Sequence, residues 1–254
     1  MKSLFVCPLC GKALTRTEKS CVCPAGHSFD LAKEGYCHLL PANRKHSKAP
    51  GDDKDMAAAR SAFLSKGYYA PLREELCRLA VSMTGNAPTV LDAGCGEGYY
   101  TGGIYGALLA AGKQVRMAGT DISKFILRRA AKREKDIEFA VASSYHLPVA
   151  DGSVELLLNC FSPLALEEFR RVLRPEGMML YVVPSEKHLW EVGCGRLYDL
   201  VITFGGDTVK SYFGLRDIRL DGFKYLINGK SVFQRLVLDQ GFYRDGIYTA
   251  PDES

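Results

Sequence analysis

The chain has 254 residues, of which 47% are hydrophobic and 24% are charged, and its formal net charge is +4. This length can bury one domain of about 150 to 200 residues with a small appendage, and the composition is ordinary for a water-soluble protein. No apolar run approaches the roughly 20 residues of a membrane span and the N-terminus lacks a signal-peptide core, so we expect a cytoplasmic protein without membrane segments.

The N-terminal segment carries a pattern of metal ligands. Cys7, Cys10, Cys23 and His27 follow the spacing Cys-x2-Cys-x12-Cys-x3-His. Paired ligands of this kind hold one tetrahedral zinc ion. A segment of about forty residues needs such a metal ion for stability, because its own hydrophobic core is too small. Cys21 competes with Cys23 for the third position, although the Cys-Pro-Ala-Gly-His turn favours Cys23. The spacing predicts a zinc ribbon, against the alternatives of reduced core cysteines and of a finger that reads DNA.

Residues 1–48 are basic. Eight lysines and arginines stand against three acidic residues, a formal charge of +5, whereas the rest of the chain is nearly neutral. This excess favours contact with phosphate groups, with an affinity that falls as salt rises. A second basic cluster at residues 128–135 lies on an expected surface helix and is more typical of a solvated face.

Residues 41–55 are polar and contain prolines and a glycine, which indicates a linker. Helical periodicity resumes over residues 56–66, and a second helix is expected up to about residue 83. The predicted organisation is a zinc-ribbon module at 1–40, a hinge-like linker at 41–55 and a second, larger domain at 56–254. Tyr69, between the two helices, is either a core aromatic or part of a cofactor rim.

The most specific motif begins where an apolar strand ends at Asp92. Gly94, Gly96 and Gly98 follow it at alternate positions. Glycines let the backbone turn from strand to helix and leave amide groups free at the helix start, which suits a nucleoside ligand. The spacing differs from that of dinucleotide-binding loops. It resembles motif I of class I methyltransferases that use S-adenosylmethionine, with a plain turn as the alternative.

Strands and helices alternate after this loop. Apolar segments predict strands at 115–120, 139–142, 154–159 and 178–183, and helices at 123–133 and 166–173, the latter ending in a turn at 174–177. Such alternation predicts an α/β fold with a Rossmann-like parallel sheet. Asp121, at the tip of the first of these strands, can accept both ribose hydroxyls.

Together these motifs resemble the bacterial 23S rRNA (guanine-N1)-methyltransferases, a family that includes macrolide-resistance enzymes. The resemblance extends from Cys7 to about Tyr198 and joins the ribbon and motif I to the segment Ala59-Arg60-x2-Phe63-Leu64-x2-Gly67-x-Tyr69-x-Pro71-Leu72. The chain departs from the family after residue 229, where a Met-Thr-Pro-aromatic element is absent. The resemblance implies Zn²⁺ ligands at Cys7, Cys10, Cys23 and His27, and S-adenosylmethionine contacts at Tyr69, Gly96, Glu97 and His188.

The activity implied by the resemblance is S-adenosylmethionine-dependent methylation of guanine N1 in a hairpin of 23S rRNA. Asn159 and Phe161 are the candidates for positioning the target base, although Phe161 is equally a core residue. A small-molecule methyltransferase is one alternative, and it would keep its activity without residues 1–48. A catalytically silent, zinc-dependent RNA-binding protein is another. The sequence leaves open the target guanosine, a homodimer, and whether the role is housekeeping or antibiotic resistance.

Overall fold

The computed structural model describes residues 2–41 and 51–184, together with the backbone of short strands between residues 197 and 231. The chain divides into two compact units, Met1–Val183 and Pro184–Ser254. No helix in the described part is long and apolar enough to cross a membrane. In the second unit the described strands pair only antiparallel, β11 (Leu197–Phe204) with β12 (Asp207–Gly214), and β14 (Lys224–Ile227) with β13 (Ile218–Asp221) and β15 (Lys230–Ser231).

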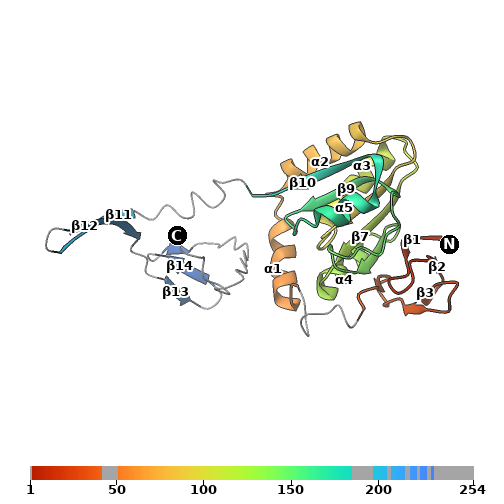
Figure 1. Cartoon of the computed structure of the whole chain (residues 1–254), viewed down its shortest axis with the longest axis horizontal. Coiled ribbons are helices and arrows are strands. Elements are labelled where there is room, and N and C mark those ends of the chain that lie inside the picture. Colours follow the sequence, from red (N-terminus) through yellow and green to blue (C-terminus); the bar gives the residue numbers. More distant parts are fainter. Residues whose placement is uncertain are drawn as a thin grey trace. The chain divides into compact units, whose positions relative to one another are not determined.

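A six-stranded parallel sheet forms the centre of the first unit (Figure 1), in the order β10-β9-β6-β7-β8-β5. Every residue of β9 is buried, as expected for a strand covered on both faces. The order reverses between β6 and β9, and ligands bind at such a switch point, outside the carboxyl ends of the strands. The predicted Rossmann-like sheet is confirmed. Its strands are β5 (Cys37–His38), β6 (Thr89–Ala93), β7 (Arg116–Asp121), β8 (Glu138–Val141), β9 (Val154–Cys160) and β10 (Leu173–Val182).

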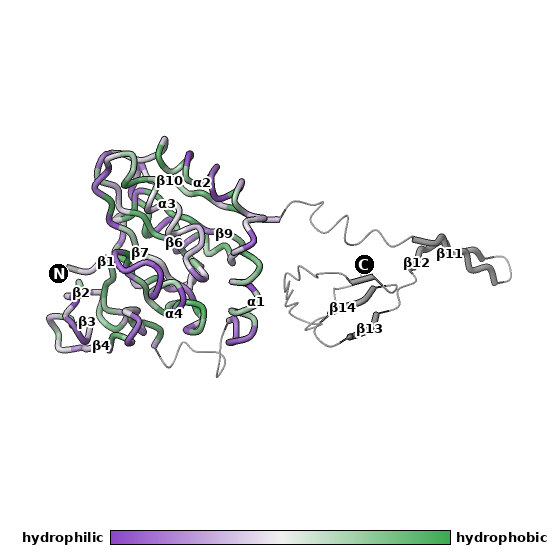
Figure 2. Tube along the Cα trace, turned by 180° about the vertical axis from the view of Figure 1, so that it is seen from behind, coloured by the Kyte–Doolittle hydropathy of each residue, from purple (hydrophilic) through white to green (hydrophobic). Residues whose placement is uncertain are grey.

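The two faces of this sheet are covered by different elements. Leu156 and Leu158 of β9 pack with helices α2, α3 and α4, whereas Leu157 points the opposite way, as alternation along a strand requires. On the side of Leu157 lie α5 and part of the N-terminal ribbon, including Phe5. Apolar segments accordingly gather around β6 and β9 in Figure 2. The helices are α2 (Ala70–Met83), α3 (Tyr99–Ala110), α4 (Lys124–Arg133) and α5 (Leu166–Val172).

One predicted boundary is wrong. The turn expected at residues 174–177 is part of β10, which begins at Leu173 directly after α5. The pairing register with β9 shifts between Leu173 and Met178, so the extra residues are taken up as a bulge. Gly177 lies close to the neighbouring strand, because a Cβ there would approach the carbonyl oxygen of Val154 to 2.9 Å.

The N-terminal ribbon is a four-stranded antiparallel sheet whose chain continues into the central sheet. Its strands are β1 (Lys2–Val6), β2 (Ala13–Arg16), β3 (Ser20–Val22) and β4 (Ser28–Asp30), and β5 then adds to β8 as the sixth parallel strand. The amide of Val6 donates to Pro148 O at 2.8 Å. Ser3 Oγ donates to Glu138 Oε2 at 2.5 Å. The ribbon and the sheet therefore share one core.

The expected hinge at 41–55 lies mostly outside the described residues, but its end is fixed. Arg60 on α1 (Lys54–Leu64) pairs with Asp52 at 2.8 Å, and Ser123 Oγ donates to the carbonyl oxygen of Asp52. Asp53 caps α1 by accepting from the amides of Asp55 and Met56. The start of α1 is thereby attached to the start of α4, at the carboxyl end of the sheet.

Candidate active site and metal centre

The glycine-rich loop connects β6 to α3. Gly94, Gly96 and Gly98 have φ angles of 92°, 54° and 79°, in the left-handed region that favours glycine. The amides of Gly94 and Cys95 donate to the carbonyl oxygen of Thr120, which fixes the loop to the end of β7. The loop thus lies at the switch point, where the sheet order predicts a ligand.

Asp92 and Asp121 lie at the carboxyl ends of the neighbouring strands β6 and β7, as the last residue but one of β6 and the last of β7. Asp92 is fully buried, and its Oδ2 accepts a hydrogen bond of 2.7 Å from Thr101 Oγ1. Burial raises the pKa of Asp92 to about 7. Asp121 accepts from the amides of Gly96 and Ser123 at 3.0 and 2.9 Å, and burial raises its pKa as well. Asp121 therefore braces the loop besides being available to ribose hydroxyls.

Several buried acceptor atoms around the loop have no hydrogen-bond partner among the described residues. They are Asp92 Oδ1, Glu97 Oε2, Thr120 Oγ1 and Asn159 Oδ1. Buried polar atoms are normally satisfied, so unpaired acceptors at a ligand crevice indicate a donor-bearing ligand. S-adenosylmethionine carries an ammonium group and two ribose hydroxyls, which are donors of this kind. The residues present therefore fit the cofactor.

Two further residues, which the sequence did not single out as site residues, hold Asp92 and Glu97 in place. Thr101 orients Asp92, and Arg133 pairs with Glu97 Oε1 at 3.1 Å. Arg133 belongs to the basic cluster that we expected to be solvated. In the same cluster Arg128 pairs with Glu34 of the ribbon, and Lys135 donates to the Glu34 carbonyl. This cluster therefore has structural roles within the protein.

The tip of β9 brings a second group of residues to the glycine loop. Asn159 Nδ2 donates to the carbonyl oxygen of Ala93 at 2.8 Å. Phe161 has φ 52°, unusual for a residue with a side chain, and its ring is 42% exposed. Ser162 lies against the loop, because a Cβ on Gly94 would approach Ser162 Oγ to 2.1 Å. The Tyr69 and Phe161 rings meet edge to face at 5.9 Å.

The structure thus brings Tyr69, motif I, Asn159 and Phe161 to one end of the sheet. His188, the remaining predicted cofactor contact, lies outside the described residues. Burial raises the pKa of Cys160 far above neutrality, which keeps its thiol protonated and unsuited to a covalent route.

The four predicted zinc ligands form a compact cluster in the ribbon. One ligand atom from each of Cys7, Cys10, Cys23 and His27 lies within 4.8 Å of the others. Cys10 Sγ and Cys23 Sγ are 3.7 Å apart, close to the spacing of about 3.8 Å between sulfurs on a tetrahedral Zn²⁺. Burial opposes ionisation of Cys23, but the amides of His27 and Ala25 lower its pKa to about 6, which favours the thiolate.

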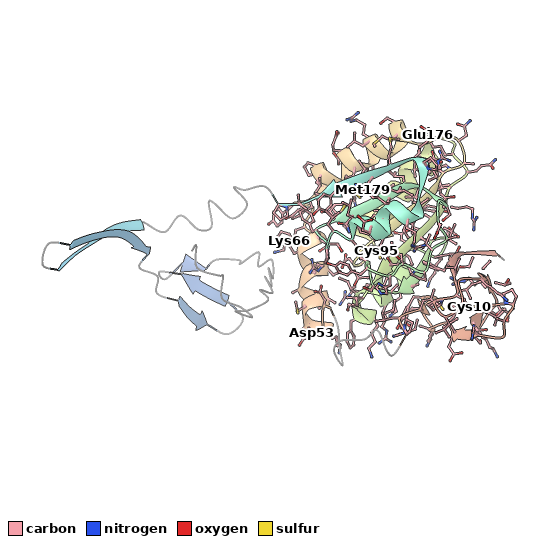
Figure 3. All side chains as sticks on the ribbon, in the orientation of Figure 1. Cys10, Asp53, Lys66, Cys95, Glu176 and Met179 are labelled. Atoms are coloured by element: carbon pink, nitrogen blue, oxygen red, sulfur yellow. The ribbon has the colours of Figure 1, made fainter. Side chains whose placement is uncertain are left out.

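The rival ligand Cys21 lies outside the cluster and hydrogen-bonds with Cys37. Cys10 is also well separated from Cys95 of the glycine loop in Figure 3. The cluster therefore fits a structural zinc ion, since a catalytic one would have to reach the cofactor.

Comparison with known proteins identifies a zinc ribbon and a methyltransferase domain in this chain. The family model described as "RlmA, N-terminal", a zinc ribbon, matches residues 5–48, and a methyltransferase-domain model matches residues 90–177. The chain is 38% identical over 189 residues to the 23S rRNA (guanine(748)-N(1))-methyltransferase of Streptomyces fradiae, covering 73% of this chain and 65% of that one. It is 35% identical over 195 residues to a Bacillus subtilis protein named "Putative 23S rRNA (guanine-N(1)-)-methyltransferase YxjB", covering 75% and 67%.

The chain belongs to the 23S rRNA (guanine-N(1))-methyltransferase family. The alignments span about two thirds of the length of these relatives. Both matched family models, a zinc ribbon and a methyltransferase domain, agree with zinc and S-adenosylmethionine as the cofactors.

Proposed function

We propose that this protein transfers a methyl group from S-adenosylmethionine to N1 of a guanine in a hairpin of 23S rRNA, in the cytoplasm. The observation that carries the proposal is the meeting of the β9 tip with motif I, where Ser162 lies against Gly94. An exposed aromatic ring, that of Phe161, stands beside the cofactor loop, as a site that accepts a flipped base requires. The zinc ribbon in the same unit and the names of the relatives support RNA as the substrate.

The chemistry follows from guanine itself. N1 carries a proton, so a bond from N1 to the methyl carbon forms as the sulfur–carbon bond breaks, and the N1 proton leaves to an acceptor. When bound, S-adenosylmethionine supplies the electrophilic methyl group. The protein supplies alignment and exclusion of water. Phe161 stacks on the base and backbone carbonyls of the β9 tip hold its edge, while Tyr69, in edge-to-face contact with Phe161, contacts the cofactor.

The zinc ligands, the cofactor contacts and the base-positioning residues are part of this proposal. Cys7, Cys10, Cys23 and His27 hold Zn²⁺. Motif I, with Asp92, Glu97 and Asp121, holds the cofactor, and the unpaired acceptors around it support that role. His188, outside the described residues, completes the proposed cofactor contacts.

The test is transfer of labelled methyl from S-adenosylmethionine to 23S rRNA that lacks the modification. Nucleoside mass spectrometry should detect 1-methylguanosine, and a primer-extension stop should locate it. Position 748 is the first to inspect, because one relative is named for it. Free rRNA, ribosomal particles and small-molecule acceptors should be compared, and sedimentation will show whether the active species is a homodimer.

Gly96→Arg provides the matched inactive control, since it fills the loop. Zinc-replete protein that binds the cofactor but leaves every RNA unmodified would overturn the proposal in favour of a small-molecule acceptor. Protein that binds RNA but not the cofactor would indicate a silent binder.

A further inference from the structure

Four aromatic rings form a continuous series between α1 and the tip of β9. Tyr68 meets Phe63 at a centroid distance of 5.4 Å, Phe63 meets Tyr69 at 5.8 Å, and Tyr69 meets Phe161 at 5.9 Å. The two middle rings are partly buried, whereas the two end rings are exposed, Tyr68 by 62% and Phe161 by 42%. Exposed aromatic rings in a contiguous series are unusual unless a partner covers them.

The turn that carries Tyr68 is ordered by its own hydrogen bonds. The amides of Lys66 and Gly67 donate to Phe63 O and Leu64 O, and the amide of Ala70 donates to Gly67 O. Gly67 has φ 76°, and a Cβ there would have no atom within 4 Å, so the turn is open to solvent. Its exposed Tyr68 ring is therefore presented by a formed turn that packs on Phe63.

A lysine lies two residues before Tyr68 in the same turn. Lys66 is exposed at the end of α1 (Figure 3), and no salt bridge or hydrogen bond of its ammonium group is found in the described part of the chain. The turn therefore carries an exposed aromatic side chain and an exposed lysine two residues apart. Single-stranded RNA has the matching chemistry, with a base that stacks on aromatic rings and a phosphate that pairs with lysine.

We propose that Tyr68 and Lys66 hold an unpaired nucleotide that flanks the target guanine, with its base on the Tyr68 ring and its phosphate at the Lys66 ammonium group. This inference rests on the proposed function, because the ring series joins Tyr68 to Phe161 at the methyl-transfer site. Nucleotides that flank a flipped base must also leave the helical stack, and a second ring stabilises them there. Lys66 favours RNA over an apolar peptide as the occupant.

The test measures methylation rates of unmethylated 23S rRNA as a function of RNA concentration. Tyr68→Ala should raise the KM for RNA about tenfold, the usual effect of losing one base–aromatic stack. Tyr68→Phe should behave as wild type and Tyr68→Leu as the alanine variant, because a stack requires a ring. The kcat, the Kd for S-adenosylmethionine and the melting temperature should stay unchanged in all three variants. Leu109→Ala, at an exposed apolar residue of α3, is the matched control.

Lys66→Ala should raise the KM for RNA and reduce its dependence on salt, whereas Lys132→Ala on α4 should do neither. The proposal is overturned if Tyr68→Leu retains the wild-type KM, or if the Tyr68 variants change cofactor affinity, which would show that Tyr68 acts through Tyr69. Equal effects of Lys66→Ala and Lys132→Ala would also overturn it, since they would indicate diffuse attraction. Absence of RNA methylation by the wild-type protein is a different result, and it refutes the proposed function.

Discussion

The Glu34 carboxylate of the ribbon accepts a 2.9 Å ion-paired hydrogen bond from the Arg128 guanidinium on α4, across 94 residues of sequence. Glu34 is nearly buried, and its hydrogen bond with Arg128 lowers its pKa. The same helix begins directly after Ser123, whose amide donates a hydrogen bond to Asp121. The ribbon is thereby connected through α4 to the cofactor loop.

This connection predicts that the ribbon stabilises the methyltransferase domain. Glu34→Gln should lower the melting temperature by a few degrees, as measured by circular dichroism, and the loss should vanish as the pH falls through the lowered pKa of Glu34. Glu18→Gln, at an exposed ribbon residue, should leave the melting temperature unchanged. Deletion of residues 1–48 removes β5 and seven of the eighteen buried residues of one core cluster, so it should unfold much of the domain. Point variants are accordingly a better test of RNA dependence than this deletion.

The cysteines of the ribbon should differ in their effect on zinc. Cys23→Ser should lose bound zinc and destabilise the ribbon, because Cys23 belongs to the cluster of four ligands. Cys21→Ser should retain one zinc ion per chain, because Cys21 lies outside the cluster and forms a hydrogen bond with Cys37. Metal analysis of both purified variants measures this, and equal zinc content in the two would contradict the assignment.

Asp92 should make stability depend on pH. Its pKa is raised to about 7, so between about pH 4 and pH 7 the folded protein holds a proton that the unfolded chain has lost. Stability should therefore fall as the pH rises through this window. Asp92→Asn should remove the fall and be more stable than wild type by a few kcal/mol at pH 8.

Urea unfolding of zinc-saturated protein at pH 5 and pH 8 measures this difference, with Asp136→Asn as an exposed control. The Asn variant should bind S-adenosylmethionine less tightly at pH 8, since it lacks the carboxylate. Parallel stability curves for wild type and Asp92→Asn would refute the prediction.

The backbone conformation at Phe161 should lower the stability of the protein, whereas its ring should be needed for activity. Its left-handed φ costs on the order of 1 kcal/mol for a residue with a Cβ, and glycine avoids that cost. Phe161→Gly should therefore be more stable than Phe161→Ala, which lacks the same ring but keeps the Cβ. Both should lose most methyl transfer while retaining cofactor binding. Chemical denaturation and single-turnover rates of the pair check this, and equal stability would show that the backbone there is unstrained.

The sheet and the glycine loop could be predicted because their signals are local. The apolar run of β9 and the glycines after Asp92 each reflect a requirement of a few adjacent residues. The contacts that complete the site are not local. Thr101 reaches Asp92 through the first turns of α3, and Tyr69 meets Phe161 only after the sheet has formed. The bulge at the start of β10 was missed because Pro175 and Gly177 suggest a turn.

The same limit applies to the ribbon. The spacing of its ligands predicts a zinc site, whereas nothing in the sequence shows that residues 37–38 form a strand that pairs with β8. Two residues are too few to show the alternation of a strand, and Ala140, the residue that pairs with Cys37, lies 103 residues further along the chain.

Because β5 directly follows the four ribbon strands and is the outermost strand of the parallel sheet, the two parts cannot be inherited separately. A ribbon exchanged from a distant relative would have to bring with it a strand that pairs with the edge of β8, a partner for Arg128 and a side chain that fills the place of Phe5. The zinc ribbon and the methyltransferase domain of this chain are therefore constrained to evolve together.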